Sequence, residues 1–160
     1  MPDQNTVTLR DIIPSDLPIF FDMQRDPDAN YMAAFTSRDP SDRQAFDLHW
    51  AKIMSDETVI NQTILFNGEV VGNIAKFIMF GQPEIGYWID KVFWGKGIAT
   101  QALKAFLEIV TMRPLYAAAA KDNAGSLRVL QKCGFVITGY NRAFAEARGA
   151  EIEEALLELK

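Results

Sequence analysis

The chain has 160 residues, of which 49% are hydrophobic and 23% charged, with a net charge of −5. This length and composition are those of one ordinary globular domain, so they exclude a disordered, collagen-like or disulfide-stapled protein. The excess of acidic over basic side chains argues against a general nucleic-acid-binding protein, because a negative surface repels phosphate backbones. The one cysteine, Cys133, leaves no intrachain disulfide, which fits a reducing compartment.

The sequence also gives no sign of a membrane or metal partner. No run reaches the roughly 18 apolar residues that a membrane span needs. The first five residues are polar and lack the basic and apolar regions of a signal peptide, so we expect a cytoplasmic protein that does not act at a membrane. His49 is the one histidine, so no metal site is expected.

The first third of the chain predicts one short strand followed by helices. Residues 7–10 alternate apolar and polar side chains, as a strand does. Ser15 is the expected N-cap of a first helix that ends before Asp26. A loop or an irregular helical segment then runs to Pro40, and Ser41 is the expected cap of the second helix. That helix has apolar residues at helical spacing: Phe46, Trp50 and Ile53.

The next segment predicts three antiparallel strands. Residues 58–66 and 70–79 are rich in β-branched and aromatic side chains and flank Asn67-Gly68. An Asn-Gly pair between two apolar runs is the strongest short hairpin signal. Residues 84–89 form the third strand of this meander.

The second half alternates helices and strands. A helix is expected over 98–110, and a second one runs from its cap Asn123 to Lys132, before Gly134. Strands are expected over 114–120, 135–138 and 153–159, with the polar residues 140–150 as a link. This element order predicts an α+β, or mixed α/β, fold.

A glycine turn lies between a predicted strand and a predicted helix: Trp94-Gly95-Lys96-Gly97-Ile98-Ala99-Thr100. The first N–H groups of a helix have no intrahelical partner, and the helix dipole favours an anion there. Glycine lets the backbone approach a phosphate closely, and Lys96 adds a positive charge. The pattern therefore predicts a phosphate site, for a mononucleotide, a dinucleotide or coenzyme A.

The spacing of the glycines and Lys96 excludes two known types of phosphate-binding loop. In a Walker loop a Ser or Thr follows Gly-Lys, whereas here Gly97 follows Lys96. A dinucleotide-binding turn needs Gly or Ala at the sixth position from Gly95, where this chain has Thr100. A nicotinamide-dependent oxidoreductase therefore fails on spacing. A glycine turn without any ligand remains the alternative.

Three motifs in order resemble the GNAT N-acetyltransferase superfamily, in particular its ribosomal-protein N-terminal (alanine/serine) acetyltransferases. Trp94–Ala99 is similar to the family's pyrophosphate loop, and Glu84–Ile89 to the strand before it. Asn123–Ser126 with 132–135 is similar to the helix and strand that follow. There are two departures. Trp94 replaces the usual Gln or Arg, and Leu130 stands where many members have a tyrosine that protonates the leaving thiolate.

The resemblance implies a fold and an activity. The fold would be a three-layer α/β/α domain over residues 1–160, with a splayed, mostly antiparallel central sheet of six to seven strands. The activity would be acetyl transfer from acetyl-coenzyme A to a primary amine, on a protein N-terminus or a small molecule, by direct attack in a ternary complex. The chain would need no metal and would be a monomer or homodimer.

The resemblance also implies site residues. Glu84 would be the general base, directly or through water, although it could instead only bind the acceptor. Ser126 would protonate or hydrogen-bond the thiolate, although a first-turn serine can also simply bond to backbone. The Ile89 N–H would bind the thioester oxygen. The remaining cofactor-binding residues would be Trp94, Gly95, Lys96, Gly97, Ile98, Ala99, Thr100 and Asn123.

Two questions stay open at this point. The missing tyrosine at Leu130 leaves a non-catalytic coenzyme A-binding module as the alternative to an enzyme. Residues 26–40 and 140–151 would flank the acceptor groove, and acceptor choice is expected to reside there because loops are the least constrained part of a fold.

Overall fold

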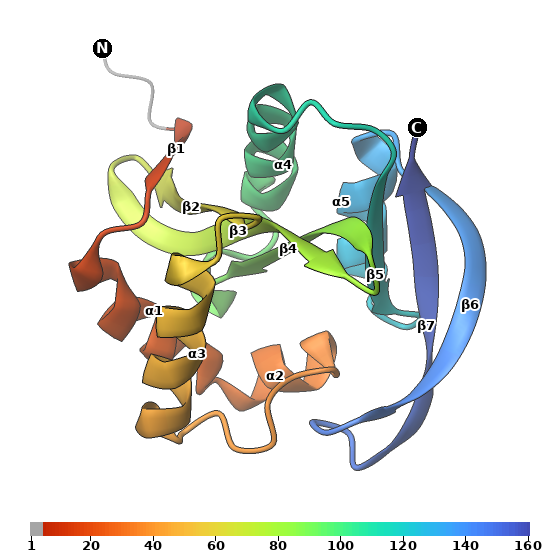
Figure 1. The fold of residues 1–160 in the computed structure, drawn as a ribbon, viewed down its shortest axis with the longest axis horizontal. Helices are drawn as coiled ribbons and strands as arrows, with labels where there is room; N and C mark the ends of the chain where they lie inside the picture. Colours follow the sequence, from red (N-terminus) through yellow and green to blue (C-terminus); the bar gives the residue numbers. More distant parts are fainter. Residues whose placement is uncertain (1–4) are drawn as a thin grey trace.

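The computed structural model describes residues 5–160, in which seven strands form one sheet of order β1-β2-β3-β4-β5-β7-β6 (Figure 1). The strands are β1 (Val7–Asp11), β2 (Ile60–Phe66), β3 (Glu69–Met79), β4 (Gln82–Ile89), β5 (Leu115–Ala120), β6 (Val136–Ala145) and β7 (Ala150–Leu159). The helices are α1 (Leu17–Gln24), α2 (Pro27–Ala33), α3 (Arg43–Ser55), α4 (Ile98–Ile109) and α5 (Ala124–Lys132), with short 3₁₀ turns η1 (Pro14–Asp16) and η2 (Lys91–Phe93). Four of the five N-terminal residues on which the signal-peptide expectation depends lie outside the described range. Within residues 5–160 the helices are too short or too polar to cross a bilayer.

The sheet separates two cores and so makes three layers. On one face, α4 and α5 bury Ile98, Phe106 and Leu130 against the sheet residues Ile74 and Leu157. On the other face, α1 and α3 form an aromatic cluster with side chains of β3 and β4. Its members are Phe20, Phe21, Met23, Phe46, Trp50, Val70 and Trp88. This arrangement confirms the mixed α/β class and the three layers.

The sheet is splayed between β4 and β5. Every other neighbouring pair of strands is antiparallel, and β4 is paired with β3 along the whole length of β4. The parallel pair β4–β5 has a single residue pair in register, Glu84 with Tyr116. From that point to Ile89, β4 runs beside an opening, because β5 instead follows β7.

Most of the expected elements are present, but two helix caps were wrong. Asn67 and Gly68 both have positive φ, as the hairpin turn requires, and Asn123 accepts the Ser126 N–H at 3.2 Å as the cap of α5. Ser15 instead lies inside η1, and the chain enters α1 from Asp16. The cap of α3 is Asp42, whose carboxylate accepts the Ala45 N–H, so Ser41 lies one residue too early.

Two segments are more regular than the sequence indicated. Asp26 caps the short helix α2, and Pro27 at its first position supplies a helical φ. The expected link over 140–150 is mostly a hairpin, because β6 and β7 pair from Val136 with Glu158 to Ala145 with Ala150. Much of β6 is solvent-exposed, so its polar sequence gave no core alternation to reveal the strand.

The buried carboxylate of Asp16 links the turn η1 to strands β1 and β2. Asp16 is fully buried and accepts two hydrogen bonds from Arg10, at 2.7 and 2.8 Å, one from the Ile13 N–H and one from the Thr63 hydroxyl. Burial alone would raise the pKa of Asp16, but these hydrogen bonds outweigh it and lower the pKa to about 2. The ionised carboxylate is therefore part of the folded state at neutral pH.

We predict that Asp16→Asn lowers the free energy of unfolding by about 3 kcal/mol, because it leaves Arg10 with an uncompensated charge. Since the folded pKa is depressed, the contribution is present above about pH 4 and is lost as pH falls towards the folded value of about 2. Urea unfolding from pH 7 to pH 2 measures this difference. Asp22→Asn is the control, because Asp22 is 76% exposed and its ion pair with Arg25 is long, at 3.7 Å, and therefore weak. Equal stability of the two variants at pH 7 would contradict the prediction.

Candidate functional site

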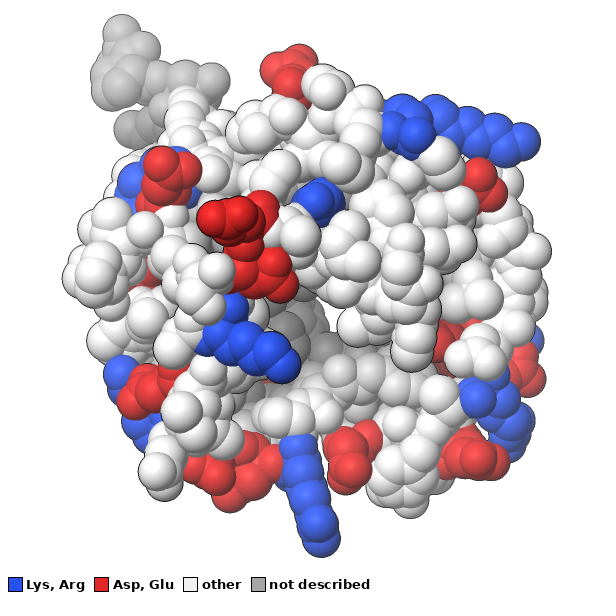
Figure 2. Space-filling model, viewed as in Figure 1, with Lys and Arg blue, Asp and Glu red and all other residues white. Residues whose placement is uncertain are grey.

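A cavity of about 690 Å³ lies at the opening between β4 and β5 and is closed by the first turns of α4 and α5. In Figure 2 the molecule is hollowed between the α1/α3 pair and this opening, with acidic and basic side chains around the hollow. The predicted site residues that line the cavity are Ile89, Trp94, Gly95, Gly97, Ile98, Ala99, Thr100, Asn123 and Ser126. Among the described residues the lining includes neither Glu84 nor Lys96. The structure thus brings together residues from the three motifs, with two exceptions.

The glycine turn has the geometry of an anion site. Gly97 is the N-cap of α4 and has a φ of 75°, while Gly95 has a φ of 78°. A Cβ added at Gly95 would have no atom within 4 Å, and one at Gly97 would only touch the Gln101 amide at 4.0 Å. Because Gly97 has no side chain to cap the helix, the first N–H groups of α4 have no side-chain acceptor at the N-cap and remain available to an anion.

Trp94 acts as a brace beneath this turn. Its indole Nε1 donates a hydrogen bond of 2.9 Å to the carbonyl oxygen of Ile89, the last residue of β4. The bond fixes the turn relative to the strand end, although the side chain itself is partly exposed. Lys96 is exposed and points to solvent rather than into the cavity lining. Backbone N–H groups are therefore the main donors that the turn offers.

The Ile89 N–H points into the opening. The next amide, of Asp90, donates to the Val71 carbonyl on β3 at 2.8 Å. Successive amides of an antiparallel strand point to opposite edges, so the Ile89 N–H points towards β5. In residues 5–160, β5 has its one β4 register pair at Glu84, far from Ile89. A donor at this position fits the predicted role in binding a carbonyl oxygen.

Tyr87, to which the sequence interpretation gave no catalytic role, contacts Ser126 at the edge of the cavity. The hydroxyl groups of Tyr87 and Ser126 are 2.8 Å apart, and both residues line the cavity. Burial raises the pKa of Tyr87 to about 12, although the hydrogen bond with Ser126 opposes the rise. Alternation along β4 was the available signal, because Ile85, Tyr87 and Ile89 share one face of a strand.

Leu130 of α5, at the position where many family members have a tyrosine, is part of the core. Leu130 is 2% exposed and packs in the cluster between α4, α5 and the sheet. A hydroxyl nevertheless reaches the first turn of α5, because Tyr87 supplies one from β4. The missing tyrosine on α5 therefore does not leave Ser126 without a phenolic neighbour.

Glu84 lies at the start of the opening, on the sheet face opposite to Ile85. It is half-buried, and burial, together with the negative charge of Glu154 on β7, raises the pKa of its carboxyl group. Ile89 lies five positions further along β4, so the two Cα atoms are about 16 Å apart at the usual rise of a strand. Glu84 can therefore exchange protons with the cavity only through water or a bound molecule.

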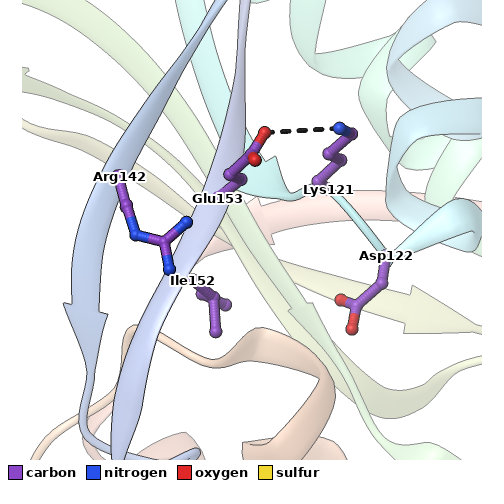
Figure 3. Close-up of a pocket in the computed structure, with 5 residues that line it drawn as sticks. All are labelled: Lys121, Asp122, Arg142, Ile152 and Glu153. Carbon is purple, nitrogen blue, oxygen red and sulfur yellow. Dashed lines mark hydrogen bonds and ion pairs between the residues drawn. The ribbon is translucent and has the colours of Figure 1, made fainter.

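A second hollow of about 490 Å³ lies beside β6 and β7 and gathers other residues (Figure 3). Lys121 and Glu153 form an ion pair of 3.3 Å there, while the Asp122 carboxylate is turned away from that pair towards Arg148. Its charges are thus largely neutralised within the protein, and none of the predicted site residues lines it. Within residues 5–160 no three His, Cys, Asp or Glu side chains are placed to hold a metal ion.

Comparison with known families identifies the family of this chain. Residues 6–136 match the family model described as Acetyltransferase (GNAT) domain. The chain belongs to the GNAT acetyltransferase family.

Two curated relatives come from Bacillus subtilis. YdaF, whose name describes a ribosomal N-acetyltransferase, is 31% identical over 100 residues, which are 58% of this chain and 55% of the relative. YjcK, an N-acetyltransferase by name, is 36% identical over 89 residues, which are 50% of this chain and 49% of the relative. This GNAT chain spans about half the length of the curated relatives it matches.

Two solved structures have the same fold. RimJ of Mycobacterium smegmatis, in complex with CoA-disulfide, has a TM-score of 0.81 and 22% identity, over 98% of this chain and 82% of that one. Spermidine N-acetyltransferase of Vibrio cholerae, in complex with CoA and spermine, has a TM-score of 0.81 and 16% identity, over 96% and 94%. At these identities the likeness concerns the fold.

We predict that Gly97→Val weakens coenzyme A binding by at least about tenfold. A β-branched side chain disfavours a φ of 75° and would occupy the open space in front of the α4 amides. Isothermal titration with coenzyme A measures the affinity.

Gly81→Val is the matched control. Gly81 has a φ of 77° and open space around its added Cβ, but it lies in the β3–β4 turn and does not line the cavity. An equal loss of affinity in both variants would mean that strain, and not the site, is responsible.

Proposed function

We propose that this GNAT protein transfers the acetyl group of acetyl-coenzyme A to a primary amine by direct attack in a ternary complex. The observation that carries the proposal is the cavity at the β4–β5 opening. One space combines the anion-binding turn of α4, the free strand edge at Ile89 and the hydroxyl pair Tyr87–Ser126. Family membership supports the proposal, and so do the fold neighbours that hold coenzyme A.

Backbone N–H groups would bind acetyl-coenzyme A. The α4 amides would bind the pyrophosphate, where the helix dipole adds attraction for a negative charge. The pantetheine arm would lie along the open edge of β4. The Ile89 N–H would then donate to the thioester oxygen, which becomes more negative as the amine attacks, so the bond strengthens in the transition state.

The amine must lose a proton to attack. Glu84 would accept it through water, because its carboxylate is half-buried at the start of the opening and has a raised pKa. A base with a raised pKa holds the proton more firmly than an ordinary carboxylate does, which suits a group that must take a proton from an amine. Binding of a cationic acceptor by the same carboxylate is compatible with this role.

The leaving thiolate must gain a proton. As the C–N bond forms and the C–S bond breaks, the sulfur takes up the electron pair. Ser126 would donate a hydrogen bond to the sulfur, or would pass it a proton that the Tyr87 hydroxyl, 2.8 Å away, replaces on Ser126 and that solvent then replaces on Tyr87. At neutral pH Tyr87 keeps its proton, because its pKa lies near 12.

Thiol release tests the function itself. The protein is incubated with acetyl-coenzyme A and an amine panel, and free thiol is followed against a no-amine blank. The panel holds peptides with N-terminal Ala or Ser, spermidine and free amino acids, because the relatives' names point to a ribosomal protein and to spermidine. Coenzyme A binding without thiol release from any amine would favour the non-catalytic binding module.

We predict that Glu84→Gln lowers the transfer rate at neutral pH by about a hundredfold and leaves coenzyme A affinity nearly unchanged. In the unmodified protein the rate should fall as pH drops through the raised pKa of Glu84. Glu154→Gln removes the neighbouring negative charge, so the pKa of Glu84 falls and this acid limb moves to lower pH. Rates measured from pH 4.5 to 9 check both changes.

Two variants control for the Glu84 experiment. Glu158→Gln, on the same strand β7, should leave the acid limb in place, because Glu158 is not a cause of the shift at Glu84. Tyr87→Phe should lower the rate without moving the limb. An unchanged rate in Glu84→Gln, or an unmoved limb in Glu154→Gln, would reduce Glu84 to a structural or binding role.

A further inference from the structure

One arginine in the β6–β7 turn is nearly buried although the turn lies at the surface. The Arg148 side chain is 7% exposed, whereas that of its partner Asp122 is 62% exposed. Two guanidinium nitrogens donate to the two Asp122 oxygens at 2.8 and 3.0 Å, and Nε donates to the Tyr31 carbonyl. The guanidinium also stacks over the Tyr31 ring at 3.9 Å. We name Arg148, Asp122 and Tyr31 the clasp.

The clasp connects three segments that are distant in sequence. Tyr31 belongs to α2, Asp122 to the link between β5 and α5, and Arg148 to the hairpin turn (Figure 1). A backbone bond strengthens the contact, because the Ala147 N–H donates to the Ala34 carbonyl at 3.2 Å. The negative partner is well suited to the role, since Arg148 holds the pKa of Asp122 below its usual range.

The helix that the clasp holds is a wall of the cavity. Ala29, Met32 and Ala33 of α2 line it, whereas Tyr31 and Arg148 lie behind the wall, outside the lining. Next to the clasp, Asn123 Nδ2 donates to the Met32 carbonyl at 3.2 Å. The clasp therefore controls how α2 approaches the first turn of α5, where Ser126 lies.

Helix α2 depends on such contacts. Seven residues are too few for a helix that is stable alone, and it is followed by Ala34, a non-glycine residue with a φ of 66°. At its other end, Asp28 pairs with Lys91 of η2, close to the glycine turn. The helix thus lies along the cavity between two ion pairs, Asp28–Lys91 and Arg148–Asp122. Only the second of these two is bidentate.

We propose that Arg148 is a positioning residue, which sets the amine-binding wall of the site by holding α2 against the start of α5. For the amine this inference rests on the proposed acetyl transfer. An arginine is required, because its planar fork meets both carboxylate oxygens and stacks on the tyrosine ring, whereas a lysine has one point charge. The pyrophosphate turn and the strand edge of the cofactor half lie on α4 and β4, away from the clasp, so coenzyme A affinity should depend on it much less than amine binding does.

Arg148→Lys is the informative variant, because it keeps the charge and loses the fork. With the amine that gives the most thiol release in the panel, KM for that amine should rise about tenfold or more, since small displacements of positioning groups are costly. The dissociation constant of coenzyme A should stay within about twofold of the unmodified value. Amide hydrogen exchange over residues 27–34 should become faster than in the unmodified protein. Asp122→Asn should give the same pattern.

Arg142→Lys is the matched control on the same hairpin. Arg142 is 63% exposed and its Nε is 3.7 Å from Glu151, so the change should leave KM, coenzyme A affinity and exchange unaltered. Melting temperatures of all variants show whether they fold.

Specific outcomes would overturn the inference. Unchanged exchange over 27–34 in both Arg148→Lys and Asp122→Asn would show that the clasp does not hold α2. Faster exchange throughout the chain, with equal losses of amine and coenzyme A binding, would make Arg148 a general stability residue. If no amine in the panel reacts, the proposed function fails by thiol release, while exchange and coenzyme A titration still decide whether the clasp holds α2.

Discussion

The divergence of β4 from β5 is the constraint on which the site depends. Parallel neighbours need a crossover helix, here α4, and β5 returns beside β4 only at Glu84 and Tyr116. Its six residues pair instead with β7, from Leu115 with Leu159 to Ala120 with Glu154. The last residues of β4 are left with an open edge. Backbone groups at such an edge need partners, and a pantetheine arm or water can provide them.

The same opening explains how an acidic chain can hold an anionic cofactor. The net charge is −5, and Lys96, the one lysine in the glycine turn, points away from the cavity lining. The donors are instead backbone amides at the start of α4, whose direction is fixed by Gly95 and Gly97 and by the brace of Trp94 on Ile89. Oriented amides act at short range and are insensitive to the overall charge. The acidic surface therefore does not conflict with a phosphate site.

Local signals in the sequence predicted the elements best. Asn67-Gly68 and Asn123 act through their own backbone neighbours, and the structure agrees with both predictions. Ser15 and Ser41 failed as caps because an aspartate one residue later is the residue from which each helix starts. Exposed strands such as β6 carry no core alternation, so a polar segment was interpreted as a link.

The site was predictable in its cofactor half and less so elsewhere. Motif order located the α4 turn, Ile89 and Ser126 in one cavity. It did not reveal the pairing of Tyr87 with Ser126, because that contact joins β4 to α5 across the core. It also did not show that Glu84 lies outside the cavity lining. Such contacts depend on how strands and helices pack together, and no short motif contains them.

The two halves of the site differ in what holds them. The cofactor half is continuous with the core, since Ile89, Ile98 and Leu130 are buried in one cluster. A change there costs packing energy, which limits the sequences that can form it. The proposed amine half would be a seven-residue helix and a hairpin turn, which are held by polar contacts such as those of Arg148. Those contacts can be exchanged at little cost to the fold. A fold built this way can keep its cofactor chemistry while its acceptor changes, which is why the motifs of this chain indicate the donor and leave the amine open.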